Sequence, residues 1–221
     1  MPLISASYWK PKNENLDRAK LDDQVSAMTV AILSGATSGA LHAVTGPDHL
    51  LSLGPAVLRA PRAASRIGFL WGAGHALGTL ALALPLLVLA QWVKLSLLAS
   101  AGNRLAGAAL LVTALWSWRS AKAPVLATEA KARSPLWVGL LHGITGASAL
   151  LLVLPSALAG SAPRAVVYLV AFAVGSTLAM AALTHALGKV GGRLEPRVVA
   201  RSQRALLLGA ALLGSLWLAC G

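Results

Sequence analysis

The chain has 221 residues, of which 57% are hydrophobic and only 12% are charged, and its mean hydropathy is +0.70. The net charge of +12 does not indicate a nucleic-acid-binding protein, because the basic residues fall in the gaps between apolar runs. The single cysteine, Cys220, excludes an internal disulfide. Apolar runs of about 20 residues, the length needed to cross a hydrocarbon core of about 30 Å, predict an all-α polytopic membrane protein.

Six membrane spans are predicted from these runs. In chain order they are 25–44 with a half-helix at 47–58, then 67–93, 105–118, 136–159, 165–187 and 205–220. The predicted organisation is a polar tail (1–24), a first three-helix repeat (25–120), a basic cytoplasmic loop (121–134) and a second three-helix repeat (135–221). Tryptophans such as Trp71 lie mostly near span ends and are interpreted as interfacial anchors.

A polar octet, His42-Ala-Val-Thr-Gly-Pro-Asp48-His49, lies at the end of the first apolar run. A charged side chain at the bilayer centre costs at least about 2.5–3.5 kcal/mol on insertion scales. Gly46-Pro47 interrupts the helix between these polar residues. A broken helix that carries metal-ligand side chains at membrane depth indicates an ion site.

The octet belongs to an internal repeat with an offset of 100 residues. Residues 39–51 read GALHAVTGPDHLL and residues 139–151 read GLLHGITGASALL. The copies lie three spans apart and so enter the bilayer from opposite sides. This predicts two inverted three-helix repeats, with the first and fourth helices broken at Thr-Gly, and a site near the midplane where the repeats meet.

The basic residues predict the orientation of the chain. The loops after the first, third and fifth spans carry twelve Lys and Arg, and those after the second and fourth spans carry three. The positive-inside rule therefore places both termini on the non-cytoplasmic side of the cell (inner) membrane.

The histidines indicate the chemistry of the site. All five lie in or at the edge of apolar spans, and Asp48 is the only acidic residue inside one. Imidazole suits zinc, copper, iron and nickel, whereas carboxylate favours harder ions, so the set suits a borderline divalent metal such as nickel or cobalt. The predicted metal ligands are Asp48, His49, His42, His75 and His142. His185 lies near a span end and is interpreted as interfacial.

Structural alternatives remain open for these residues. Thr45 to Asp48 is similar to a capping box, with Thr45 as N-cap and Asp48 at the third helical position. His42 and His142 could form a hydrogen-bonded pair that holds the repeats together. His75, among closely spaced glycines, could make a hydrogen bond within a tight helix packing.

At His42 to His49 the chain resembles the nickel/cobalt transporter superfamily, and within it the UreH-like and NicO-type branch, which carries His-x-x-Thr-Gly-Pro-Asp-His-Leu. Gly139-Leu-Leu-His142-Gly-Ile-Thr-Gly and Phe69-Leu-Trp-Gly-Ala-Gly-His75 are similar to two further motifs of that branch. The resemblance covers residues 26–220. The chain departs from the superfamily by having five residues between His42 and Asp48 instead of four, and by lacking a long histidine-rich loop.

The resemblance implies a permease for nickel or cobalt, with His42, Asp48 and His49 as selectivity residues and His75 nearby. The chain is thus predicted to be a secondary transporter of divalent metal. We expect no enzymatic activity, since HExxH, GxSxG, Walker and CxxC motifs do not occur. The metal is then a transported substrate, without a permanently bound cofactor. Expected partners are the lipid bilayer, the metal ion and metalloenzyme maturation proteins, with no nucleic acid.

Three other functions remain open. The chain could export another small solute or anion on the same scaffold. It could deliver metal to a maturation factor without transporting it. It could also carry electrons through haem ligated by paired histidines.

Overall fold

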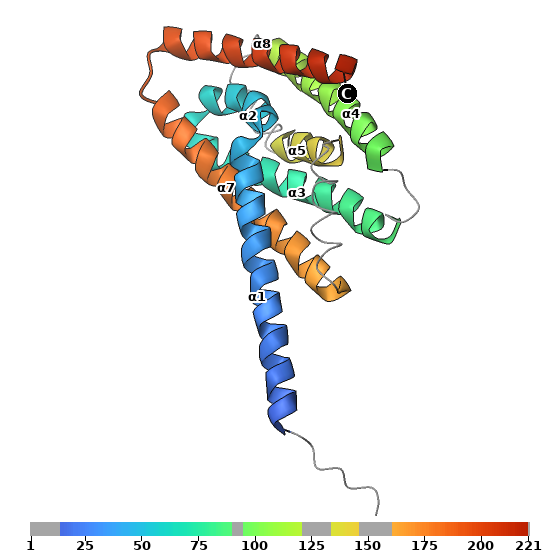
Figure 1. Ribbon diagram of the computed structural model, residues 1–221. Coiled ribbons are helices and arrows are strands. Elements are labelled where there is room, and N and C mark those ends of the chain that lie inside the picture. Colours follow the sequence, from blue (N-terminus) through green and yellow to red (C-terminus); the bar gives the residue numbers. More distant parts are fainter. Residues whose placement is uncertain (1–13, 90–94, 121–133, 146–160, 221) are drawn as a thin grey trace, which may run out of the picture.

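The computed structural model describes residues 14–89, 95–120, 134–145 and 161–220, and over these residues it is all-helical (Figure 1). The elements are α1 (Glu14–Thr45), α2 (Pro47–Arg59), the 3-10 turn η1 (Pro61–Ala63), α3 (Ala64–Leu89), α4 (Leu95–Ser120), α5 (Ser134–Thr145), α7 (Ala162–Gly191) and α8 (Pro196–Cys220). The predicted all-α class is confirmed. Helix α1 begins within the segment 1–24 that was predicted to be a polar tail.

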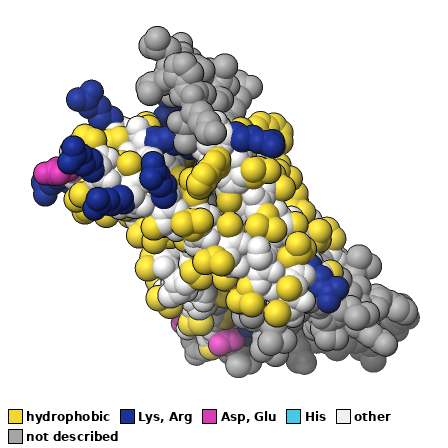
Figure 2. Space-filling model, turned by 90° about the horizontal axis from the view of Figure 1, so that it is seen from above, with side chains coloured by type: hydrophobic (Ala, Val, Ile, Leu, Met, Phe, Trp, Pro, Cys, Tyr) yellow, Lys and Arg dark blue, Asp and Glu magenta, His cyan; other side chains and the backbone are white. Residues whose placement is uncertain are grey.

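Four of the described helices are long and apolar enough to cross a membrane. They cover Asp17–Thr45, Pro61–Pro85, Ala162–Gly191 and Pro196–Cys220. Hydrophobic side chains cover much of the surface seen in Figure 2, as lipid contact requires. Helices α4 and α5 occupy the predicted third span and the start of the fourth, while 146–159 lie outside the described residues. The complete six-span arrangement stays a prediction.

The helices form a bundle from which the N-terminal end of α1 projects (Figure 1). Helix α1 packs along α7, and α3 packs against both α5 and α7. Helix α8 lies across α2 and α4. The C-terminal end of α1, where the polar octet begins, packs against α7 and leads directly into α2.

Glycines allow these helices to approach backbone to backbone. Gly39 on α1 lies against the carbonyl of Phe172 on α7, and Gly143 on α5 lies against the carbonyl of His75 on α3. A side chain at either glycine would collide with a backbone that has no freedom to move aside. Close approach through small residues is the usual mode of helix packing in membranes. It brings His142, the neighbour of Gly143, next to α3.

The predicted break in the first helix is present. Helix α1 ends at Thr45, Gly46 is extended (φ −72°, ψ 106°), and α2 begins at Pro47. The Thr45 hydroxyl donates to the Leu41 carbonyl at 2.8 Å, and the N-cap of α2 is Gly46, which makes no side-chain cap bond. The capping-box alternative is therefore wrong. A Cβ at position 46 would lie 2.6 Å from Nδ1 of His49, so glycine lets this ring fold back over the break.

Candidate functional site

The structure brings all five predicted metal ligands together. We call them the histidine–aspartate cluster: His42 on α1, Asp48 and His49 on α2, His75 on α3, and His142 on α5. The break at Gly46 sets the relation between the first three, because it lets the chain turn from α1 into α2. Packing of α3 and α5 supplies the other two.

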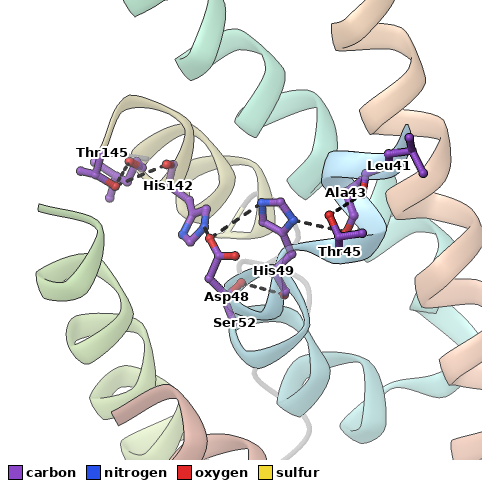
Figure 3. A network of polar contacts seen from close by, with 9 residues as sticks. Leu41, Ala43, Thr45, Asp48, His49, Ser52, His142 and Thr145 are labelled. Carbon is purple, nitrogen blue, oxygen red and sulfur yellow. Dashed lines mark hydrogen bonds and ion pairs between the residues drawn. The ribbon is translucent and has the colours of Figure 1, made fainter. Parts of the chain in front are cut away.

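A short hydrogen bond joins the two halves of the chain at Asp48. Nε2 of His142 donates to Oδ2 of Asp48 at 2.6 Å (Figure 3). The two side chains are only 2% and 13% exposed, respectively. Asp48 lies in the first turn of α2, where the helix dipole favours a carboxylate. The only acidic side chain of the cluster is therefore held by α5 as well as by its own helix.

The hydrogen bond of His49 determines which of its nitrogens is free. Nδ1 lies 3.3 Å from the carbonyl of Ala43, and Nε2 lies 3.9 Å from Oδ2 of Asp48. A carbonyl only accepts hydrogen bonds, so Nδ1 carries the proton and Nε2 of the neutral ring keeps its lone pair. A backbone carbonyl that fixes the tautomer in this way is typical of metal-binding histidines.

Several buried nitrogens of the cluster have no hydrogen-bond partner among the described residues. They are Nε2 of His42, Nε2 of His49, both nitrogens of His75, and Nδ1 of His142. Each buried polar group left unpaired costs about 1–3 kcal/mol. The rings are in mutual contact, with centroid separations of 4.7 Å for His42–His49 and 5.1 Å for His49–His75. Converging unpaired polar groups form an arrangement that an ordered water or a bound ion would satisfy.

The cluster contains two overlapping sets of possible metal ligands. One consists of His42, His49 and His75, and the other of Asp48, His49 and His142; within each set the ligand atoms lie within 4.8 Å of one another. Bonds of about 2.0–2.1 Å at tetrahedral angles place two ligand nitrogens about 3.3 Å apart, so atoms as far apart as 4.8 Å would have to move closer together around an ion. Since Nδ1 of His49 is engaged with Ala43, only Nε2 can bind metal. The two sets therefore compete for one ion.

The structure does not show the alternative hydrogen bonds proposed for these histidines. No hydrogen bond joins His42 to His142, since Nε2 of His142 binds Asp48 and Nε2 of His42 is unpaired. His75 makes no packing hydrogen bond to any residue that the structure describes, since both of its nitrogens lack a partner there. His185 is exposed, lies outside the cluster and bonds Ser65.

Sequence reasoning missed Trp71, which is fully buried in the cluster and is not an interfacial anchor. Its ring stacks on His75 at 5.1 Å, with 7° between the planes, and also contacts His49 and His142 at 5.3 and 5.2 Å. The spacing offered a signal, because residues four apart share one face of a helix. Thr79, four residues beyond His75, also has a buried hydroxyl that finds no partner within the described part of the chain.

Two curated proteins of Arabidopsis thaliana are similar to this chain. Chloroplast protein FOR GROWTH AND FERTILITY 1 is 29% identical over 192 residues, covering 75% of this chain and 51% of the relative. Chloroplast protein FOR GROWTH AND FERTILITY 2 is 29% identical over 182 residues, covering 75% and 49%. The chain spans about half the length of these relatives. No family profile and no solved structure matches it.

These relatives correct the assignment made from the octet. They are named for the chloroplast, growth and fertility, and neither is named as a metal transporter. The membership in the nickel/cobalt transporter superfamily, its UreH-like and NicO-type branch and the nickel or cobalt permease function were therefore wrong. The motif is short and differs by one residue in its spacing. The motif specifies which metal-ligand atoms are present, whereas transport of an ion across the membrane depends on the whole protein.

Proposed function

We propose that this chain is an integral membrane protein that holds one divalent first-row transition-metal ion in the histidine–aspartate cluster. The observation that carries the proposal is the convergence of five buried, unpaired imidazole nitrogens beside a single carboxylate. Metal binding would satisfy nitrogens that are otherwise left unpaired at a cost in free energy. The bound ion would also tie together α1, α2 and α3 through the first ligand set, or α2 and α5 through the second.

The donor atoms favour particular metals. Four imidazoles and one carboxylate offer mainly nitrogen ligands, which suit zinc or iron(II) better than the all-oxygen sites of magnesium and calcium. Copper(I) prefers softer sulfur ligands, and the single cysteine, Cys220, is exposed and lies outside the cluster. Zinc is therefore the appropriate probe.

The ring contacts do not support a haem site. The imidazole centroids of the cluster lie 4.7–5.7 Å apart. Rings that touch one another leave no space for a flat macrocycle between two axial ligands.

We also propose the inverted repeat as the architecture that builds the cluster. Helices α1 and α5 each end in a threonine, Thr45 and Thr145, whose hydroxyl donates to the carbonyl four residues earlier at 2.8 Å. Gly39 on α1 packs against the backbone of α7, and Gly139 at the corresponding position of α5 packs against that of α3. Each half thus packs the helix that leads into its Thr-Gly motif against a helix of the other half, as two symmetry-related repeats would.

The names of the relatives favour a chloroplast membrane over the predicted inner cell membrane. The orientation with both termini on the non-cytoplasmic side remains a prediction from loop charge. Three further expectations also remain predictions: the lack of enzymatic activity, the partnership with metalloenzyme maturation proteins, and the lack of a nucleic-acid partner.

Isothermal titration of the purified full chain with zinc tests the metal site. We expect saturable binding of one ion per chain, with no comparable response to magnesium. His49→Ala should abolish binding, because His49 belongs to both ligand sets. His185→Ala is the matched control, since it removes an imidazole outside the cluster and should bind zinc as the parent does. Absence of saturable binding, or unchanged binding in His49→Ala, would contradict the proposal.

A further inference from the structure

Two basic segments that are distant in the sequence lie side by side in the fold. Ser65, at the start of α3, and His185, near the end of α7, are hydrogen-bonded between Oγ and Nδ1 at 2.9 Å. The carbonyl of Pro61 lies 2.8 Å from the position that a Cβ on Gly188 would take. The segment 59–66 therefore packs against the end of α7, next to the turn that leads into α8.

This packing gathers exposed cations at one end of the molecule. We call it the basic end and define it by Arg62, Arg66, Lys189, Arg193, Arg197, Arg201 and Arg204. Figure 2 shows Lys and Arg side chains crowded together on one side of the surface. Glu195 is the only acidic residue in 59–66 and 189–204. Within the described residues, the only ion pairs link histidines to Asp48, so these seven cations are unpaired.

Exposed apolar side chains alternate with the cations along the end of α7 and the start of α8. The repeating pairs are Lys189-Val190, Arg193-Leu194 and Arg197-Val198. The apolar members are 56%, 38% and 40% exposed, respectively. Cations interleaved with exposed aliphatic groups are typical of surfaces that lie at the boundary between lipid headgroups and acyl chains.

We propose that the basic end binds the headgroups of anionic lipids. Helices α7 and α8 are both long and apolar enough to span a membrane, so the turn that joins them must emerge at a membrane surface. Guanidinium groups bind phosphate oxygens through paired hydrogen bonds, and clustered cations are attracted to a negatively charged leaflet. The adjacent exposed aliphatic side chains favour lipid over an acidic protein segment. This inference does not depend on metal in the histidine–aspartate cluster.

The N-terminal part of α1 supplies an internal comparison. Its exposed cations, Arg18 and Lys20, are interleaved with Asp17, Asp22 and Asp23. They lie at the opposite end of the molecule from the α7–α8 turn (Figure 1). Neighbouring carboxylates cancel their field at the surface, so we expect no preference for anionic lipid there.

Native mass spectrometry of the detergent-purified full chain tests the proposal with short-chain phosphatidylglycerol and, as the neutral comparison, short-chain phosphatidylcholine. We expect tighter binding of phosphatidylglycerol, weakened by salt. Arg197→Gln/Arg201→Gln should lower that affinity by about fivefold or more. Arg18→Gln/Lys20→Gln removes the same charge and should leave the affinity unchanged. Both variants alter exposed positions, so their thermal unfolding midpoints should stay near that of the parent.

Two results would overturn the proposal. One is equal affinity of the parent for the two lipids, and the other is undiminished phosphatidylglycerol binding by Arg197→Gln/Arg201→Gln. A poly-glutamate peptide, added to the chain in pure phosphatidylcholine vesicles, supplies a further arm. The peptide could bind in a way that depends on Arg197 and Arg201 while the chain shows no preference for phosphatidylglycerol. That result would identify an acidic protein, and not an anionic lipid, as the ligand of the basic end.

Discussion

The hydrogen bond between Asp48 and His142 should tie α5 to α2. It joins side chains 94 residues apart at 2.6 Å, and it is the only described hydrogen bond between these two helices. A hydrogen bond to a charged group contributes about 1.5–3 kcal/mol net. With Asp48 13% exposed, we expect Asp48→Ala, which removes the acceptor, to lower the free energy of unfolding by about 1.5–3 kcal/mol without metal.

A double-mutant cycle isolates this contribution. The free energy of unfolding of the parent, Asp48→Ala, His142→Ala and the double variant is measured by denaturant titration in detergent with a chelator present. We expect a coupling energy of at least about 1 kcal/mol between the two positions, since residues in direct contact are not additive. Thr145→Val is a suitable control, because it removes a hydroxyl hydrogen bond within α5 itself. A coupling energy near zero would refute the reasoning that this bond links the helices.

Three further predictions concern the same region. Zinc at about 100 times its dissociation constant should raise the free energy of unfolding of the parent by about 2.7 kcal/mol. It should leave the free energy of unfolding of His49→Ala unchanged. Thermal unfolding of both proteins, with and without zinc, measures the difference. Trp71→Phe should abolish a zinc-dependent change in tryptophan fluorescence, since Trp71 stacks on His75, and should cost about 0.5–1.5 kcal/mol of stability; an unaltered fluorescence response would show that another tryptophan reports the ion. Gly143→Leu should destabilise the chain by about 1–3 kcal/mol or prevent folding, because Gly143 lies against the carbonyl of His75. The control is Gly192→Leu, which alters an exposed turn. The two variants are compared by size-exclusion profile and unfolding midpoint.

Some features of the fold were predictable because they are encoded over a few neighbouring residues. Apolar runs of membrane-crossing length predict helices, and the helical class followed from them. Gly46-Pro47 predicts a break, because proline cannot continue the hydrogen bonding of a preceding helix. Thr45 was harder to interpret, since a threonine hydroxyl can cap the next helix or bond the carbonyl four residues earlier. The structure shows the second arrangement.

The octet also shows where reasoning from a short motif fails. His42, Asp48 and His49 predicted a set of metal ligands; the structure places these side chains in one cluster, and their binding of a metal stays a prediction. The same residues also suggested a nickel or cobalt transporter, and the relatives of the chain do not support that assignment. Ligand chemistry resides in a few side chains, whereas the activity of a transporter resides in pathways and conformational changes that a motif does not encode.

The amino-acid sequence by itself thus determined the membrane character of the protein, the broken first helix and the donor atoms available for an ion. Tertiary structure decided that His142 contacts Asp48, that Trp71 lies inside the cluster, and that two distant basic segments form one surface. The physical reason is the range of the interactions. Hydrophobicity and backbone restrictions act within a few residues, whereas these contacts depend on which helices approach closely, and glycines such as Gly39 and Gly143 permit that approach.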